Sequence, residues 1–273
     1  TEFLFERAKG GKTSEAVLVS GTLLALSMPP AAPLWLVALA SAFGVFMAKE
    51  VYGGFGRNIF NPAIAGRLFV YISFAALMGQ SFYQPGSFGQ AAGSLFGQPD
   101  AISGATPLAI MRDGGSVPIL DLLLGTRSGA IGESSIVLLA AIALYLVATK
   151  TAQWRLIVST LGSGAALCII LWMAGVPGAL PPQSLLAGSF VFVAVLMSTD
   201  PVSAPKKKGA QWAYGSLIGA SVIVIRSFSL FSEGTSFAVL LGNSFASMFD
   251  RMASQSAQKR KAKTEAAAKE AGK

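Results

Sequence analysis

The amino-acid sequence predicts an all-α membrane protein, a polytopic helix bundle with inverted repeats and broken helices. Composition is the first reason: 53% of the 273 residues are hydrophobic, 12% are charged and the mean hydropathy is +0.59, as is typical of integral membrane proteins. The second reason is the spacing of apolar windows along the chain. The third is a pair of similar proline-interrupted turns, one in each half.

Apolar windows recur from residue 13 to residue 249, each near or slightly below the roughly 20 residues that a spanning helix needs. They are 13–28, 34–48, 64–79, 134–149, 156–175, 184–198, 212–227 and 235–249. We therefore expect residues 1–252 to form a membrane domain with about eight crossings. The chain opens on a charged amphipathic stretch without an initiator Met or a signal peptide, so we expect it to be truncated at its N-terminus.

The distribution of Lys and Arg sets the predicted orientation, because positively charged loops stay on the cytoplasmic side. Residues 253–273 form a basic cytoplasmic tail without large apolar groups, which we expect to be disordered or a frayed helix. Counting back through alternate crossings places the other basic clusters on the same side: 206–208, 150–155, 49–57 and 7–12. The more acidic loop 80–133 is then extracytoplasmic.

The two proline-interrupted turns occupy residues 28–33 and 197–205. Each begins with a Met, continues through mostly small residues and leads into an apolar window, and the predicted topology places the two turns on opposite faces. This arrangement is typical of inverted repeats, whose broken helices expose backbone groups to a protein cavity. The match is short, so a chance similarity stays open.

The residue types that are missing narrow the chemistry. The chain has no His and a single Cys, Cys168, within an apolar window. We therefore expect no haem, iron–sulfur or zinc site and no internal disulfide. If the chain carries electrons, the carrier is organic. A nucleic-acid partner is not expected, because no basic patch is interleaved with aromatic residues.

One loop motif combines a hydroxyl with small neighbours. It reads Asp-x-x-Ser-Gly-Ala-Thr and consists of Asp100, Ser103, Gly104, Ala105 and Thr106. A threonine on an exposed loop, flanked by small residues, suits covalent modification by an enzyme that grips the loop. An ordinary turn is the alternative, with Thr106 or Ser103 capping a helix that starts after Pro107.

A second run, residues 49–67, is rich in glycine and holds two asparagines. Asn58 and Asn61 lie three residues apart, so a helical turn would point both amides the same way, toward a ligand such as a flavin or its sugar alcohol. The alternative is a glycine-rich turn in which Asn61 caps the helix that begins at Pro62.

Three acids are candidates for an ion pathway. Asp200 follows an apolar window and precedes Pro201, at the predicted cytoplasmic end of a broken helix, and an ionisable group there usually marks an ion path or a specific partner. Asp250 ends the last apolar window, where an interfacial surface charge is an equal alternative. Glu2 is too near the chain start to be judged by position alone.

Four runs together resemble the B-type subunit of the Na+-translocating NADH:quinone oxidoreductase (Nqr), in the family that it shares with the D-type subunit of the Rnf complexes. They occur in the same order across about residues 2–252: the glycine and asparagine run at 53–67, the loop motif at 100–106, Thr-Asp-Pro-Val-Ser-Ala at 199–204 and Trp-Ala-Tyr-Gly at 212–215. The last two look more like Nqr than Rnf.

The resemblance implies a ten-helix bundle of two inverted halves, similar to urea transporters, with the first two helices absent here. It implies a flavin-carrying subunit of an NADH:quinone oxidoreductase in the bacterial inner membrane, which pumps Na+ or H+ and passes electrons toward quinone. Other subunits and a flavin transferase would be its partners. The alternatives are the D-type Rnf subunit and a urea-transporter-like channel without redox chemistry.

The resemblance also assigns roles to particular residues. Thr106 matches the threonine whose hydroxyl is joined to the phosphate of FMN through a phosphoester. Asn58 and Asn61 match positions at a riboflavin site. Glu2, Asp200 and Asp250 match acidic positions associated with ion uptake.

Overall fold

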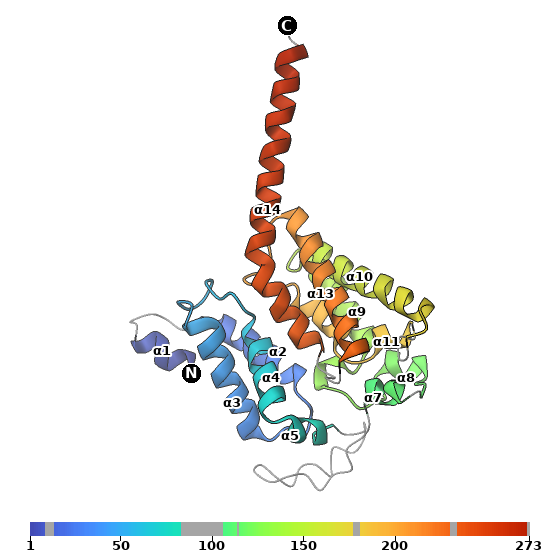
Figure 1. Cartoon of the computed structure of the whole chain (residues 1–273). Helices are drawn as coiled ribbons and strands as arrows, with labels where there is room; N and C mark the ends of the chain where they lie inside the picture. Colours follow the sequence, from blue (N-terminus) through green and yellow to red (C-terminus); the bar gives the residue numbers. More distant parts are fainter. Residues whose placement is uncertain (9–13, 83–105, 114, 177–180, 230–233, 272–273) are drawn as a thin grey trace.

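The computed structural model describes residues 1–8, 14–82, 106–113, 115–176, 181–229 and 234–271, and there it consists of helices joined by turns and loops, with no strand (Figure 1). The expectation of an all-α protein is thereby confirmed. A helix also overlaps each of the eight apolar windows.

Short and medium helices make up the first part of the chain. They are α1 (Glu2–Ala8), α2 (Ala16–Ser27), α3 (Leu34–Val45), the π-helical turn η1 (Phe46–Glu50), α4 (Pro62–Ser73) and α5 (Ala75–Gln80). The later part contains longer helices. Its elements are α7 (Pro107–Arg112), α8 (Ile119–Leu124), the 3-10 turn η2 (Ile131–Glu133), α9 (Ile136–Ala148), α10 (Trp154–Met173), α11 (Gln183–Leu186), α12 (Phe190–Phe192), the π-helical turn η3 (Val193–Met197), α13 (Lys208–Phe228) and α14 (Gly234–Ala271).

Helix α10, with 20 residues, is the one described helix that is both long and apolar enough to cross a membrane. Helices α2, α4 and α9 are apolar but shorter, so the number of crossings stays a prediction. Large apolar side chains point outward from several helices; Leu138, Leu144 and Met173 are 62%, 73% and 76% exposed. Such an apolar exterior is expected where a protein faces lipid.

Small residues let the helices pack closely. Helix α3 packs on α4, and a side chain at Gly66 would clash with the carbonyl oxygen of Ala40. Helix α13 packs between α10 and α14, and a side chain at Gly219 would clash with the carbonyl of Thr160. Helix α14 also contacts α4, which joins the two parts of the bundle.

The Trp-Ala-Tyr-Gly run lies at the start of α13 and has a packing role. The ring of Trp212 meets that of Trp154 edge to face at 6.0 Å between centroids. The buried hydroxyl of Tyr214 donates to Asn243 Oδ1 of α14 at 2.6 Å, and Gly215 leaves room for Ser159 of α10. The run therefore fixes α13 against both neighbours.

The basic tail is helical rather than disordered. Helix α14 continues without a break through residues 253–271, and Figure 1 shows its end projecting from the bundle. The composition explains this, because Ala, Lys, Gln and Glu are strong helix formers.

Candidate functional site

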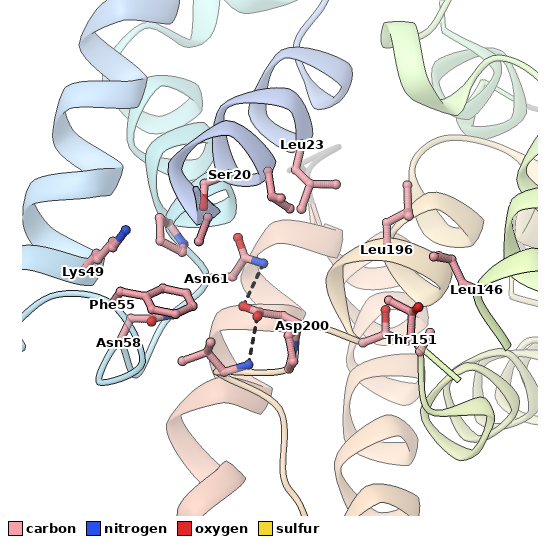
Figure 2. A pocket seen from close by; sticks show the side chains of 17 residues that line it. Ser20, Leu23, Lys49, Phe55, Asn58, Asn61, Leu146, Thr151, Leu196 and Asp200 are labelled. Atoms are coloured by element: carbon pink, nitrogen blue, oxygen red, sulfur yellow. Dashed lines mark hydrogen bonds between the residues drawn. The ribbon is translucent and has the colours of Figure 1, made fainter. Parts of the chain in front are cut away.

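A cavity of about 290 Å³, hereafter the inner cavity, lies where segments from both parts of the chain meet. The start of α2, the end of α9 and η3 supply apolar walls, including Val19, Leu146 and Leu196. Polar groups converge on it from η1, from the loop before α4 and from the turn after η3 (Figure 2). They are Lys49, Asn58, Asn61, Thr199 and Asp200.

Asn61 and Asp200 meet in this cavity although 139 residues separate them. Asn61 caps α4, because its Oδ1 accepts from the backbone N–H groups of Ala63 and Ile64 at 3.0 and 3.3 Å. Its Nδ2 is thereby turned toward Asp200 and donates to Oδ2 at 3.3 Å (Figure 2). The predicted cap is confirmed, and the capping amide also reaches the cavity.

Two further donors hold the Asp200 carboxylate. Ser203 Oγ donates to Oδ2 at 2.7 Å, and the backbone N–H of Val202 donates to Oδ1 at 3.0 Å. All three of these donors to Asp200 are neutral, so no cationic side chain hydrogen-bonds to its carboxylate within the described chain.

Asn58 lies beside Asn61 at the cavity but not on a helical turn. Both residues precede α4, so the helical reason for their common direction is wrong. The loop brings them together instead. Asn58 is 8% exposed, and its Nδ2 makes a 3.3 Å hydrogen bond to the carbonyl of Phe60.

Lys49 was not a candidate from sequence, yet it supplies a buried positive charge. Its Nζ lies 2.6 Å from Glu2 Oε2 and 2.9 Å from Ser14 Oγ, and 5.4 Å from the centre of the Phe55 ring. Lys49 sits in η1, and π-helical turns are often found at functional sites. The sequence feature that could have identified Lys49 is its position directly after the apolar window 34–48.

Glu2 is the partner that fixes α1 against η1. Its Oε1 accepts from both the backbone N–H and the hydroxyl of Ser14, at 2.9 and 2.8 Å. Burial raises the pKa of Glu2, but the hydrogen bonds from Lys49 and Ser14 lower it more, so the pKa lies below its usual value of 4.5.

Asp250 lies apart from the other two acids. Its two oxygens accept from the backbone N–H groups of Lys206 and Lys207 at 2.9 and 2.8 Å, which ties α14 to the turn before α13. It does not line the inner cavity.

Thr106 lies at a second, smaller cavity of about 30 Å³, hereafter the outer cavity. It caps α7, because its Oγ1 accepts from the N–H of Ala109 at 3.4 Å. The predicted capping role is thereby confirmed, and the hydroxyl stays partly exposed. The other motif residues, Asp100, Ser103, Gly104 and Ala105, lie outside the described residues.

These features define a helical protein with an apolar exterior and polar cavities, as expected of a membrane protein. The chain matches the model of the NQR2, RnfD, RnfE family over residues 1–259 and belongs to that family. The resemblance seen in the four sequence runs is thereby confirmed.

Curated relatives are B-type subunits of the Na(+)-translocating NADH-quinone reductase. The protein of Ectopseudomonas mendocina is 34% identical over 273 residues, with 95% of this chain and 65% of the relative covered. Those of Pseudoalteromonas atlantica and Klebsiella pneumoniae are each 34% identical, covering 95% of this chain and 64% of the relative. The chain therefore spans slightly less than two thirds of the length of these relatives.

The Lys49–Glu2 pair yields a prediction about pH. A carboxylate with a lowered pKa contributes stability above its unfolded-state pKa, and this contribution is lost as pH falls through the folded-state value. We expect Glu2→Gln to be less stable than wild type at pH 7, because Lys49 loses its buried partner, and to lose less stability on acidification. Thermal unfolding between pH 7 and pH 3 measures this.

Glu15→Gln is the matched control, because Glu15 is an exposed acid close to the same contact. It should keep the wild-type pH dependence. Identical curves for wild type and Glu2→Gln would show that the pair does not stabilise the fold.

Proposed function

We propose that this chain is a flavin-carrying membrane subunit of a redox-driven cation pump, which passes electrons from NADH-derived carriers toward quinone. The observation that carries the proposal is Thr106: a chain of the NQR2, RnfD, RnfE family presents a partly exposed threonine at the end of a Ser-Gly-Ala-Thr run. The other subunits of such a complex, quinone and Na+ or H+ would be its partners.

The B-type subunit of Nqr is the form that we favour. The runs at 199–204 and 212–215 and the identity to curated B-type subunits support it. The D-type subunit of an Rnf complex is the alternative within the same family.

Thr106 is the proposed attachment point of FMN, joined by a flavin transferase through a phosphoester. The hydrogen bond that Thr106 Oγ1 accepts is long at 3.4 Å, so it restrains the hydroxyl weakly. An ester oxygen at this position still has a lone pair for the same N–H. The cap and the attachment are therefore compatible uses of one side chain.

The inner cavity has the composition of a site for a noncovalent flavin, which we propose is riboflavin. Its volume of about 290 Å³ is close to the lower end of ligand cavities, about 300–1,000 Å³. Phe55 offers an aromatic face, Asn58 and Asn61 offer amides for a ring or sugar-alcohol edge, and Lys49 supplies positive charge. A bound flavin would supply one- and two-electron transfer.

A ten-helix fold of two inverted halves is also part of the proposal. The start of α2 and the turn after η3 line the same cavity, while η2 contacts both α2 and α12. Helices α2 and α12–η3 therefore run in opposite directions past each other. In addition, α3 packs on α4 much as α13 packs on α14.

A urea-transporter-like channel is the candidate from another functional class. It shares the proposed fold but needs no flavin. Flavin fluorescence of the denatured chain in a gel separates the two, because a channel would show none.

Replacement of Thr106 tests the covalent site. We expect Thr106→Ala to insert and fold but to carry no covalent flavin, because the attaching oxygen is lost. Thr126→Ala is the control, since Thr126 is an exposed hydroxyl on a nearby loop that donates to Asp121. In-gel fluorescence and the mass of the Thr106 peptide measure attachment, and covalent FMN in Thr106→Ala would refute the assignment.

Replacement of Asn58 tests the noncovalent site. Asn58→Leu removes an amide that makes one weak hydrogen bond, whereas Asn61→Leu would also remove the cap of α4, worth about 1 kcal/mol. We expect Asn58→Leu to lower riboflavin content at least several-fold with FMN at Thr106 unchanged. Extraction and chromatography of free flavin give the answer. Full riboflavin content in the variant would favour a purely structural loop.

Replacement of Asp200 tests cation coupling. Asp200→Asn keeps the size of the side chain but removes the charge that can offset a cation's lost hydration. We expect the assembled complex to keep both flavins, turn over more slowly and depend less on the coupling cation. The measurement is quinone reduction against cation concentration. An unchanged cation response would assign Asp200 to the structural contact with Asn61 and Ser203.

A further inference from the structure

The outer cavity contains a buried guanidinium that uses only part of its donors. Arg127, between α8 and η2, is 6% exposed. Its Nη2 donates to the carbonyls of Glu133 and Leu186 at 2.8 and 3.2 Å. Its Nε and Nη1 are buried and have no hydrogen-bond partner within the described chain. Because buried donors are almost always paired, these two call for a ligand.

Glu133 lines the same cavity and also has a buried, unpaired atom. Its Oε1 accepts from the N–H of Ala130 at 2.7 Å, which leaves Oε2 without a partner among the described residues. The side chains of Arg127 and Glu133 make no direct hydrogen bond, although the Glu133 charge stabilises the guanidinium electrostatically. Unpaired guanidinium donors and a lone carboxylate acceptor therefore both lie at this cavity.

Thr106 lies at this cavity, together with Arg127, Glu133 and Ser189. The volume of about 30 Å³ admits two or three water-sized groups, so a flavin ring does not fit inside. The two non-ester oxygens of a phosphodiester do match this size. A guanidinium donates charge-assisted hydrogen bonds to phosphate oxygens, and a carboxylate accepts from a hydroxyl.

We propose that the outer cavity binds the phosphoryl group carried on Thr106. Arg127 donates from Nε or Nη1 to a non-ester oxygen, and Glu133 Oε2 accepts from a hydroxyl of the adjoining sugar alcohol. The identity of the phosphoryl group rests on the proposed attachment of FMN, whereas the anion site depends on Arg127 and Glu133 alone. Arg127 is thus a positioning residue that anchors the flavin chain while the ring stays outside.

The first experiment uses the flavinylated chain within its complex and records the ³¹P resonance of the Thr106 phosphodiester. We expect Arg127→Gln to shift this resonance and to lower the fluorescence anisotropy of the attached flavin. Arg112→Gln is the matched control, because Arg112 is an exposed cation of α7 outside the cavity. A resonance that does not differ between wild type and Arg127→Gln would overturn the proposal.

The second experiment uses the full chain expressed without flavin transferase and titrates it with inorganic phosphate, followed by ³¹P line broadening. We expect Arg127→Gln to weaken phosphate binding about tenfold or more, and Arg127→Lys to weaken it less. Glu133→Gln keeps an acceptor for Ala130 but removes the negative charge, so it should bind phosphate more tightly. Weaker phosphate binding in both Arg127→Gln and Glu133→Gln would indicate that the two residues have a purely structural role, and would overturn the proposed site.

The outcomes separate this inference from the proposed function. A Thr106 peptide without flavin, combined with the expected order of phosphate affinities, would support the anion site and refute the proposed function. A flavinylated Thr106 whose ³¹P resonance is unchanged in Arg127→Gln would support the proposed function and refute the anion site. A copurified phospholipid that is lost in Arg127→Gln, with the phosphodiester unmoved, would assign the cavity to a lipid headgroup and overturn the proposal. If Arg127→Gln does not accumulate, Glu133→Gln decides alone.

Discussion

The hydrogen bond between Asn61 and Asp200 is the contact on which the inner cavity depends. It joins the start of α4 to the turn after η3, two polar segments inside an apolar bundle. Buried polar groups are costly unless they are paired, and here each partner also satisfies backbone groups of its own segment. The start of α4 and the end of η3 can therefore lie inside the protein. Together they form the polar part of the inner cavity, between its apolar walls.

The same constraint governs how charged groups are accommodated in the bundle. Lys49 is buried with Glu2 as its partner, while Arg127 uses one nitrogen on two backbone carbonyls. Asp250 accepts from two backbone N–H groups. Each of these groups thus has a local structural use. Arg127 and Asp200 differ from the others because part of their binding capacity is unused within the described chain. Arg127 has two donors without a hydrogen-bond partner, and the hydrogen-bond donors to Asp200 include no cation.

Local features were predictable from the sequence, and long-range contacts were not. Hydrophobic windows identified the positions of the helices, and the Asn-Pro and Thr-Pro pairs identified the caps at Asn61 and Thr106, because both depend on neighbouring residues only. The Lys49–Glu2 pair spans 47 residues and the Asn61–Asp200 contact spans 139, so no local pattern indicates them. The common direction of Asn58 and Asn61 came from a loop, where helical spacing does not apply. The shared sequence motifs supplied the family.

Two π-helical turns end the helices that lead into the inner cavity, η1 after α3 and η3 after α12. Each contains a backbone hydrogen bond that spans five residues, from Val51 to Phe46 and from Ser198 to Val193. Such a turn holds one residue more than an α-turn, so side chains beyond it are rotated by roughly 100° from the direction that the preceding helix would give them. The residues before η1 and η3 can keep the register that close packing demands, while the π-turns place Lys49, within η1, and Asp200, in the turn after η3, at the cavity. Changes in helix packing and changes in cavity chemistry can therefore accumulate independently in this protein.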